Sequence, residues 1–121
     1  MGAVSWDYLV PYQADAAAAI ADLHAARLAA GEITRSILDI AEVGDGDPYA
    51  GFLGHTYAVT EKEARVTFGT TAPTIEDLER WGGVGAPELQ SLIPAQGVGR
   101  HLVLHTDDSP SHILFWGCTG E

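Results

Sequence analysis

Two histidines near the C-terminus, His105 and His112, have a spacing that would bring them together across a β-hairpin. The segments 100–106 and 111–118 alternate in side-chain character around Asp107-Asp108-Ser109-Pro110, which is typical of two strands joined by a tight turn. Counting outward from a four-residue loop places His105 opposite His112. Their β-carbons would then lie about 4.5–5.5 Å apart, close enough to share a metal ion or a proton.

A metal site at this pair would need a third ligand, which the sequence does not specify. Asp107 and Asp108 lie nearby, but an aspartate in a turn more often hydrogen-bonds its own backbone. His101 shares the face of His105 but lies four residues away, roughly 13 Å along a strand. We therefore expect no metal. General acid or base work by histidine stays open because its unperturbed pKa is near neutrality, as does a half-exposed polar sheet face without chemistry.

The predicted hairpin has two unlike faces because side chains alternate along a strand. One face is apolar and predicts a core surface, formed by Leu102, Leu104, Ile113 and Phe115. The other mixes histidines with apolar side chains, namely His101, Val103, His105, His112, Leu114 and Trp116. Such a face usually meets a ligand, a partner chain or another part of the fold. With two aromatic residues of the first strand, the predicted substrate-binding residues are Trp6, Tyr8, His101, His105, His112 and Trp116.

No residue pattern predicts a catalytic nucleophile or a cofactor. Cys118 follows Gly117 at the end of a strand, without the helix N-terminus or adjacent cation that would lower a thiol pKa. The segment 97–99 is too short for a phosphate-binding glycine loop. The segment 44–48 contains two aspartates but lacks the glutamate that closes a calcium loop. We therefore expect no assigned catalytic residue and no cofactor.

Composition predicts one ordinary domain, residues 1–121. Hydrophobic residues make up 46% of the chain and its mean hydropathy is +0.05, as in globular proteins. The sequence has neither a membrane-spanning apolar run nor the pattern of a signal peptide. The single cysteine cannot form an internal disulfide, in keeping with a reducing compartment. The expected location is therefore cytoplasmic.

The charge balance is strongly acidic, with six Lys and Arg against seventeen Asp and Glu and a formal net charge of −11. The basic residues are scattered singly, so the basic patch that nucleic-acid binding requires is absent from the sequence. We therefore expect neither a nucleic-acid nor a membrane partner. A cationic partner is favoured electrostatically, although acidity can also serve solubility alone.

Local signals predict an α+β fold with a largely antiparallel sheet, one long N-terminal helix and short central helices. The helix at 15–30 contains nine alanines, the residue with the highest helix propensity. Thr60 and Glu63 form a capping box at a second helix. The remaining predictions are strands at 4–10, 36–40, 100–106 and 111–118, a strand or ordered loop at 51–59, and helices at 60–68, 74–81 and 87–92.

Four segments of the chain resemble small acidic proteins of actinomycetes. They are Trp6-Asp7-Tyr8-Leu9-Val10-Pro11-Tyr12, Arg35-Ser36-Ile37-Leu38-Asp39-Ile40, Phe68-Gly69-Thr70-Thr71-Ala72-Pro73-Thr74 and the terminal Gly117-Cys118-Thr119-Gly120. Among proteins of this size and style, the chain resembles the lysinoalanine-forming enzymes of duramycin- and cinnamycin-type lanthipeptide clusters. The resemblance spans most of the chain but rests on structural residues.

The resemblance implies a homodimer that binds a modified precursor peptide. It implies addition of a lysine amine to dehydroalanine, with the hydroxyaspartate of the peptide as base and the protein holding the reactive conformation, which is catalysis by orientation. It carries over no catalytic residue. Two other readings stay open: a non-catalytic peptide- or partner-binding protein that uses the histidine and tryptophan face, and a small-molecule isomerase or hydrolase that uses a histidine base.

Overall fold

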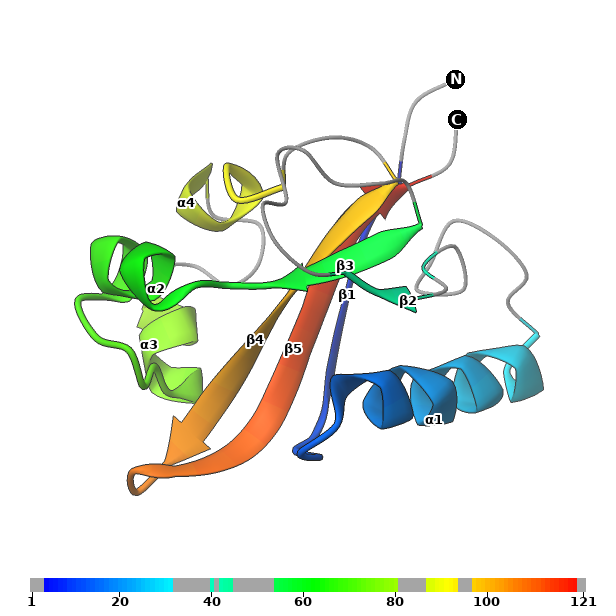
Figure 1. Cartoon of the computed structure of the whole chain (residues 1–121), viewed down its shortest axis with the longest axis horizontal. Helices are drawn as coiled ribbons and strands as arrows, with labels where there is room; N and C mark the ends of the chain where they lie inside the picture. The colour runs from blue at the N-terminus through cyan, green and yellow to red at the C-terminus, as the bar shows by residue number, and fades with distance from the viewer. Residues whose placement is uncertain are drawn as a thin grey trace.

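The sheet joins strands from both ends of the chain (Figure 1). The computed structural model describes residues 4–31, 40, 42–44, 54–80, 87–93 and 97–119. Within them a five-stranded sheet runs in the order β1-β5-β4-β3-β2. The strands are β1 (Val4–Pro11), β2 (Glu42–Val43), β3 (His55–Ala58), β4 (Val98–Thr106) and β5 (Ser109–Thr119).

The sheet is mixed: its two longer pairings are antiparallel, as expected, and its two shorter pairings are parallel, which was not predicted. β5 pairs antiparallel with both β1 and β4, whereas β3 pairs parallel with both β4 and β2. Parallel strands need a long crossover, and the helices between β3 and β4 provide it. The α+β class is confirmed. The strand expected at 36–40 lies outside the described residues except for Ile40, as does most of the 44–48 loop. Of the two alternatives for 51–59, strand or ordered loop, β3 shows a strand at His55–Ala58.

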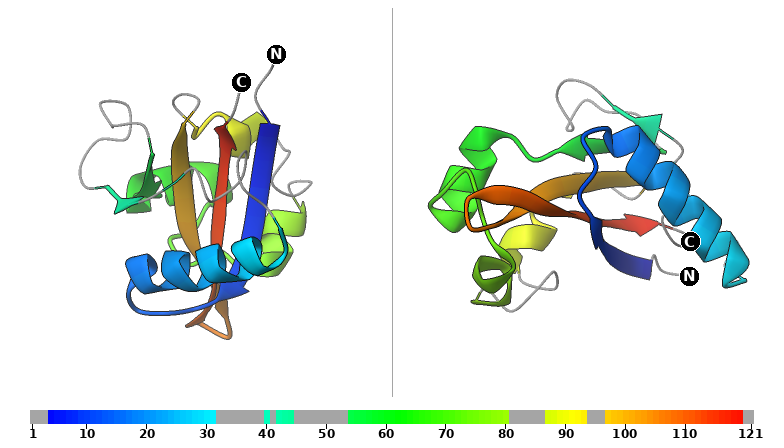
Figure 2. Two further views of the ribbon diagram at one scale, coloured as in Figure 1. Left: turned by 90° about the vertical axis from the view of Figure 1, so that its right-hand side faces the viewer. Right: turned by 90° about the horizontal axis from the view of Figure 1, so that it is seen from below.

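Helix α1 (Ala16–Ala29) confirms the alanine-rich helix and comes second in the chain, after β1. Asp15 caps it by accepting a hydrogen bond from the Ala17 amide at 3.0 Å. Ile20 and Leu23 of this helix are buried against one face of the sheet. α1 crosses that face at an angle to the strands (Figure 2). None of the described helices is long and apolar enough to span a membrane.

The short helices of the middle of the chain are α2 (Glu61–Phe68), α3 (Ile75–Arg80) and α4 (Pro87–Gln90). The capping box of α2 is present as predicted, and α4 begins at Pro87 as predicted. These helices lie on the other side of β4 from α1 (Figures 1 and 2). A second core forms there from Leu78, Leu89, Leu92, Leu102, Leu104, Leu114 and Trp116.

The β4–β5 hairpin has a two-residue turn, not the four-residue loop predicted. Asp107 and Asp108 adopt φ of 52° and 66°, as a type I′ turn requires. Thr106 therefore pairs with Ser109, and a register shift follows between Leu104 and His105.

The tight turn and the shift change the pairing of the whole hairpin. Leu104 lies opposite His112 and His105 opposite Pro110, so the predicted His105–His112 pair is wrong. A one-residue change in register moves every side chain of a strand to the other face. Leu102 therefore shares a face with Leu114, and His101 shares the opposite face with Phe115. Both faces contribute to helix-covered cores, which corrects the division into a core face and a ligand face.

Candidate functional site

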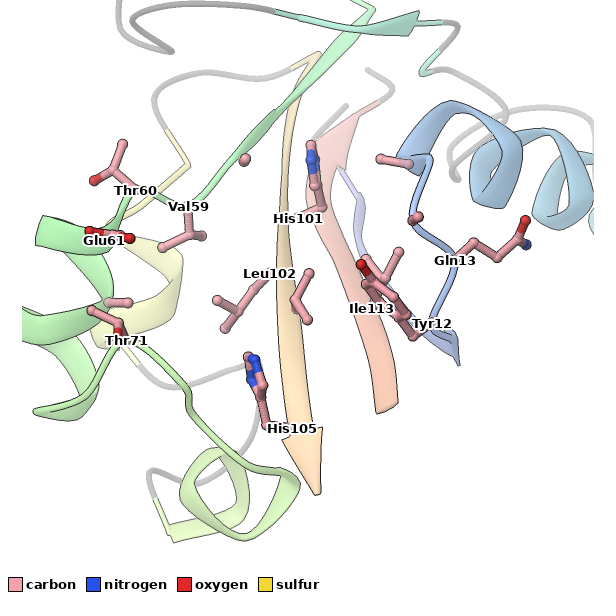
Figure 3. A pocket seen from close by; sticks show the side chains of 15 residues that line it. Tyr12, Gln13, Val59, Thr60, Glu61, Thr71, His101, Leu102, His105 and Ile113 are labelled. Atoms are coloured by element: carbon pink, nitrogen blue, oxygen red, sulfur yellow. The ribbon is translucent and has the colours of Figure 1, made fainter. Parts of the chain in front are cut away.

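A hollow of about 280 Å³ lies over β4, between the start of α1 and the start of α2 (Figure 3). We call it the His105 hollow. Val103 and Ile113 lie in its floor, and Thr60 and Glu61 border it from the α2 side. Its volume lies near the lower end of the range for small-ligand sites, about 300–1,000 Å³. The hollow is therefore suited to one or two side chains or a small molecule.

Small side chains keep the His105 hollow open. Ala14 and Ala16 border it beside the first turn of α1, and Ala64 borders it from α2. Both helices begin with polar caps, at Asp15 and Thr60. The caps stop each helix at the rim, so neither helix covers this part of the sheet. The same alanines that favour helix formation thus leave room for a ligand.

His101 forms a neutral wall of the His105 hollow. Its Nδ1 lies 3.1 Å from the Thr56 hydroxyl, and its ring packs beside Phe115 with a centroid separation of 5.6 Å. Burial and then the nearby charge of Arg100 lower the pKa of His101 to about 4. A base with this pKa is weak at neutral pH.

Arg100, which the sequence did not mark as a site residue, holds the wall of the hollow in place. Its side chain is fully buried. Its guanidinium donates to the carbonyls of Tyr57, Ala58 and Leu92 at 2.8–3.1 Å and forms a bidentate pair with Glu63. Because the donors all have partners, the cation is satisfied in the core.

Glu63 connects the Arg100 guanidinium to Thr60, at the rim of the His105 hollow. Burial raises its pKa, but hydrogen bonds from Arg100 and Thr60 outweigh burial, so the pKa of Glu63 lies below its ordinary value. The same carboxylate accepts the Thr60 amide at 3.0 Å in the capping box. One side chain therefore fixes both the start of α2 and the guanidinium of β4.

His105 borders the hollow with a side chain that makes no hydrogen bond within the described residues. Its backbone N–H donates a hydrogen bond to the Pro73 carbonyl at 2.8 Å. The imidazole is half-buried, and its Nδ1 is buried without a hydrogen-bond partner in the described chain. A buried polar atom of this kind carries a desolvation penalty. His105 therefore has hydrogen-bonding capacity available for a ligand.

The structure separates the other predicted substrate-binding residues from the hollow. His112 does not border it, and its Nδ1 lies 2.9 Å from the Ser111 hydroxyl. Tyr8 is half-buried beneath the Arg27 guanidinium, 5.5 Å from the ring centroid. Of the six residues named from the sequence, the hollow brings together only His101 and His105.

Both predicted tryptophans belong to the core, which corrects their assignment to a binding face. Trp116 is fully buried, and its indole donates to the Leu89 carbonyl at 3.1 Å. Trp6 is 7% exposed and packs flat against Gly117, where an added Cβ would lie 2.7 Å from its ring. The one-residue register change explains why Trp116 is buried, because it directs this side chain to the face covered by the short helices.

Sequence reasoning also missed the residues of the rim. Tyr12 and Gln13 border the hollow from the β1–α1 connection, and Thr71 borders it from the loop after α2. The capping box at Thr60 was the one signal in the sequence that located part of this rim. Within the described residues, no three His, Cys, Asp or Glu side chains gather in a way that would hold a metal ion.

Comparisons with family models, curated proteins and solved structures find no significant match to this chain.

Proposed function

We propose that this protein binds a modified, lysine-bearing peptide at the His105 hollow and promotes addition of the lysine amine to a dehydroalanine of the same peptide. The observation that carries the proposal is the hollow itself, which combines an apolar floor at Val103 and Ile113 with a carboxylate rim at Glu61. An apolar stem that ends in a cation matches this arrangement. The resemblance to lysinoalanine-forming enzymes supports the reaction.

Charge favours an amine over an anionic ligand at this site. Among the residues that the structure describes, neither a lysine nor an arginine borders the His105 hollow, and the whole chain carries a formal charge of −11. Arg100 precedes His101, which forms a wall of the hollow, and its charge is neutralised by Glu63. A lysine ammonium would therefore be attracted to the hollow.

The proposed reaction needs orientation more than acid or base chemistry from the protein. The lysine nitrogen forms a bond to the β-carbon of dehydroalanine while the carbon–carbon π bond breaks, and one amine proton moves to the α-carbon. No mass is gained or lost. As the resemblance implies, the peptide supplies the base. Holding the amine and the alkene in contact raises their effective concentration. The resemblance also implies that a homodimer is the form that holds them.

The test uses the dehydrated precursor peptide, incubated with and without the protein. Amine-reactivity mapping and fragmentation by mass spectrometry report the crosslink, since the total mass stays constant. Glu61→Gln should weaken peptide binding several-fold by removing the rim charge, whereas Glu76→Gln on exposed α3 serves as the matched control. Absence of both binding and crosslinking would refute the proposal, and binding without crosslinking would identify a non-catalytic binding protein.

A second candidate is a small-molecule isomerase or hydrolase with His105 as base. The observation that favours it is the His105 imidazole, which makes no hydrogen bond within the described residues. His105→Gln distinguishes the candidates. A general base should lose about 10²- to 10⁴-fold in the chemical step with binding retained, whereas an orienting site should lose binding and rate together.

A further inference from the structure

We propose that the outer edge of β1 binds the backbone of an extended peptide that alternates cationic and apolar residues, as an added strand of the sheet. The inference rests on the proposed function for the peptide nature of the ligand. It adds a second binding element, β1, and a mode of recognition in which main-chain hydrogen bonds supply affinity and neighbouring side chains supply specificity.

The register of β1 identifies the backbone groups that face outward. β1 is the end strand of the sheet in the described chain. The Tyr12 amide donates to the Ser111 carbonyl of β5 at 3.0 Å. Because antiparallel hydrogen bonding alternates along a strand, the backbones of Val10, Tyr8 and Trp6 face β5 as well. The backbones of Ser5, Asp7, Leu9 and Pro11 then point away from β5.

Pro11 occupies a suitable place in this pattern. It lacks an amide proton, so an outward position leaves no donor unsatisfied, which is where strands tolerate proline. The outward amides of Ser5, Asp7 and Leu9 remain as donors, with an outward carbonyl at each residue. This edge can pair with about four residues of a second extended chain.

An apolar groove of about 250 Å³ lies beside the end of this edge, and we call it the β1 groove. Val10 and Pro11 line it from the strand, and Ala19, Leu23 and Ala26 line it from α1. Val10 belongs to the core on the α1 side of the sheet. An added strand would direct every second side chain toward the same side, over the groove.

The two hollows adjoin at one residue. Gln13 borders both the β1 groove and the His105 hollow, and its amide donates to Asp22 at 2.8 Å. A peptide that continues past the end of β1 therefore reaches the proposed lysine site around Gln13. The edge and the hollow form parts of one path for an extended ligand.

Charge selects a cationic peptide over a second copy of the chain. Asp7 is exposed on the edge, on the face opposite Val10, and Asp22 borders the groove. In the symmetric pairing of two β1 strands centred on Asp7, the two carboxylates would lie directly opposite each other, which is destabilising. Two copies also carry −11 each. A lysine opposite Asp7 would pair with its carboxylate on one face of the sheet. The apolar residues on either side of that lysine would contact the β1 groove on the other face.

The probe is a synthetic ten-residue peptide of alternating valine and lysine. When lysine lies opposite Asp7 in an antiparallel added strand, the lysine amides face β1 and the valine amides face away. N-methylation of the lysine amides should therefore weaken binding by at least about tenfold, because it removes several inter-strand hydrogen bonds. N-methylation of the valine amides adds the same number of methyl groups and should leave affinity within about threefold of the unmodified peptide.

Hydrogen exchange followed by NMR gives the second readout. Binding should slow exchange of the Ser5, Asp7 and Leu9 amides, and Asp7→Asn should weaken binding several-fold. Asp108→Asn, in the hairpin turn, is the matched control because Asn tolerates the same positive φ. Equal affinity of the two methylated peptides, no binding of the unmodified peptide, or slowed exchange that depends on protein concentration without peptide would each overturn the inference.

The same titration keeps this inference separate from the proposed function. The methyl groups of Val103 and Ile113 report occupation of the His105 hollow, and the three edge amides report the added strand. If a lysine-bearing peptide shifts the methyl signals while the edge amides exchange unchanged, the edge inference is refuted and the proposed function stands.

Discussion

Acidification should destabilise this protein through His101 well before its carboxylates are protonated. The histidine is buried beside Thr56 and Arg100, and its pKa falls from 6.5 to about 4 on folding. In the unfolded chain the same side chain regains its ordinary pKa. The folded state therefore resists a proton that the unfolded state accepts, and the perturbation is a change of pH from about 7 to 5.

The sign and size follow from the two pKa values. The stability is fully present above pH 6.5 and falls as the pH drops toward 4, because only the unfolded state binds the proton in that interval. The whole interval corresponds to roughly 3 kcal/mol, at about 1.36 kcal/mol for each pH unit. By about pH 5, roughly 2 kcal/mol of the free energy of unfolding should be lost through this residue.

The assay is urea unfolding followed by tryptophan fluorescence, repeated across this pH range. His101→Gln retains hydrogen-bonding capacity toward Thr56 but cannot be protonated, so its stability should vary with pH by about 2 kcal/mol less than that of the natural chain. His112→Gln removes another histidine of the same sheet, outside the hollow, and is the matched control. Identical pH dependence in His101→Gln and the natural chain would refute the reasoning about burial.

Three further predictions concern the core and the hairpin, each measured by denaturant unfolding. Arg100→Met should cost about 3–5 kcal/mol, since it removes the buried cation from the part-buried Glu63 carboxylate and leaves three carbonyls without their donor; a loss below about 1 kcal/mol would contradict this account of the Arg100 contacts. Gly117→Ala should cost roughly 1–3 kcal/mol, since its Cβ would meet the Trp6 ring at 2.7 Å, and an unchanged midpoint would show that the ring shifts freely. Asp108→Gly should stabilise the chain by about 0.5–1 kcal/mol through relief of its positive φ, and destabilisation would contradict the type I′ turn.

Local sequence signals were sufficient for most helices. Asp15 and the alanines after it locate α1, the Thr60–Glu63 capping box locates α2, and Pro87 locates the start of α4. These elements are set by caps and propensities that act within a few residues. For the same reason, β1 was recognised from its alternation and its end at Pro11.

The hairpin shows where local reasoning fails. The turn permits either a two- or a four-residue loop, and both leave an alternating pattern. Pairing with β1 on one side and β3 on the other, with helices over both faces, selects the register in which Trp116 and Leu102 lie beneath the short helices. A two- and a four-residue loop keep the same faces, so the register shift between Leu104 and His105 is what exchanges them. Burial of large side chains on both faces favours that shift.

The composition of the sequence determined the acidic charge, and therefore the classes of partner that the chain repels. Its local patterns determined the helices and their caps. The tertiary structure decided which histidines border the His105 hollow, because the position of His105 depends on the register shift, on the Pro73 carbonyl and on two helices that begin at the rim. These contacts join residues far apart in the sequence, and no periodicity along a single strand encodes them.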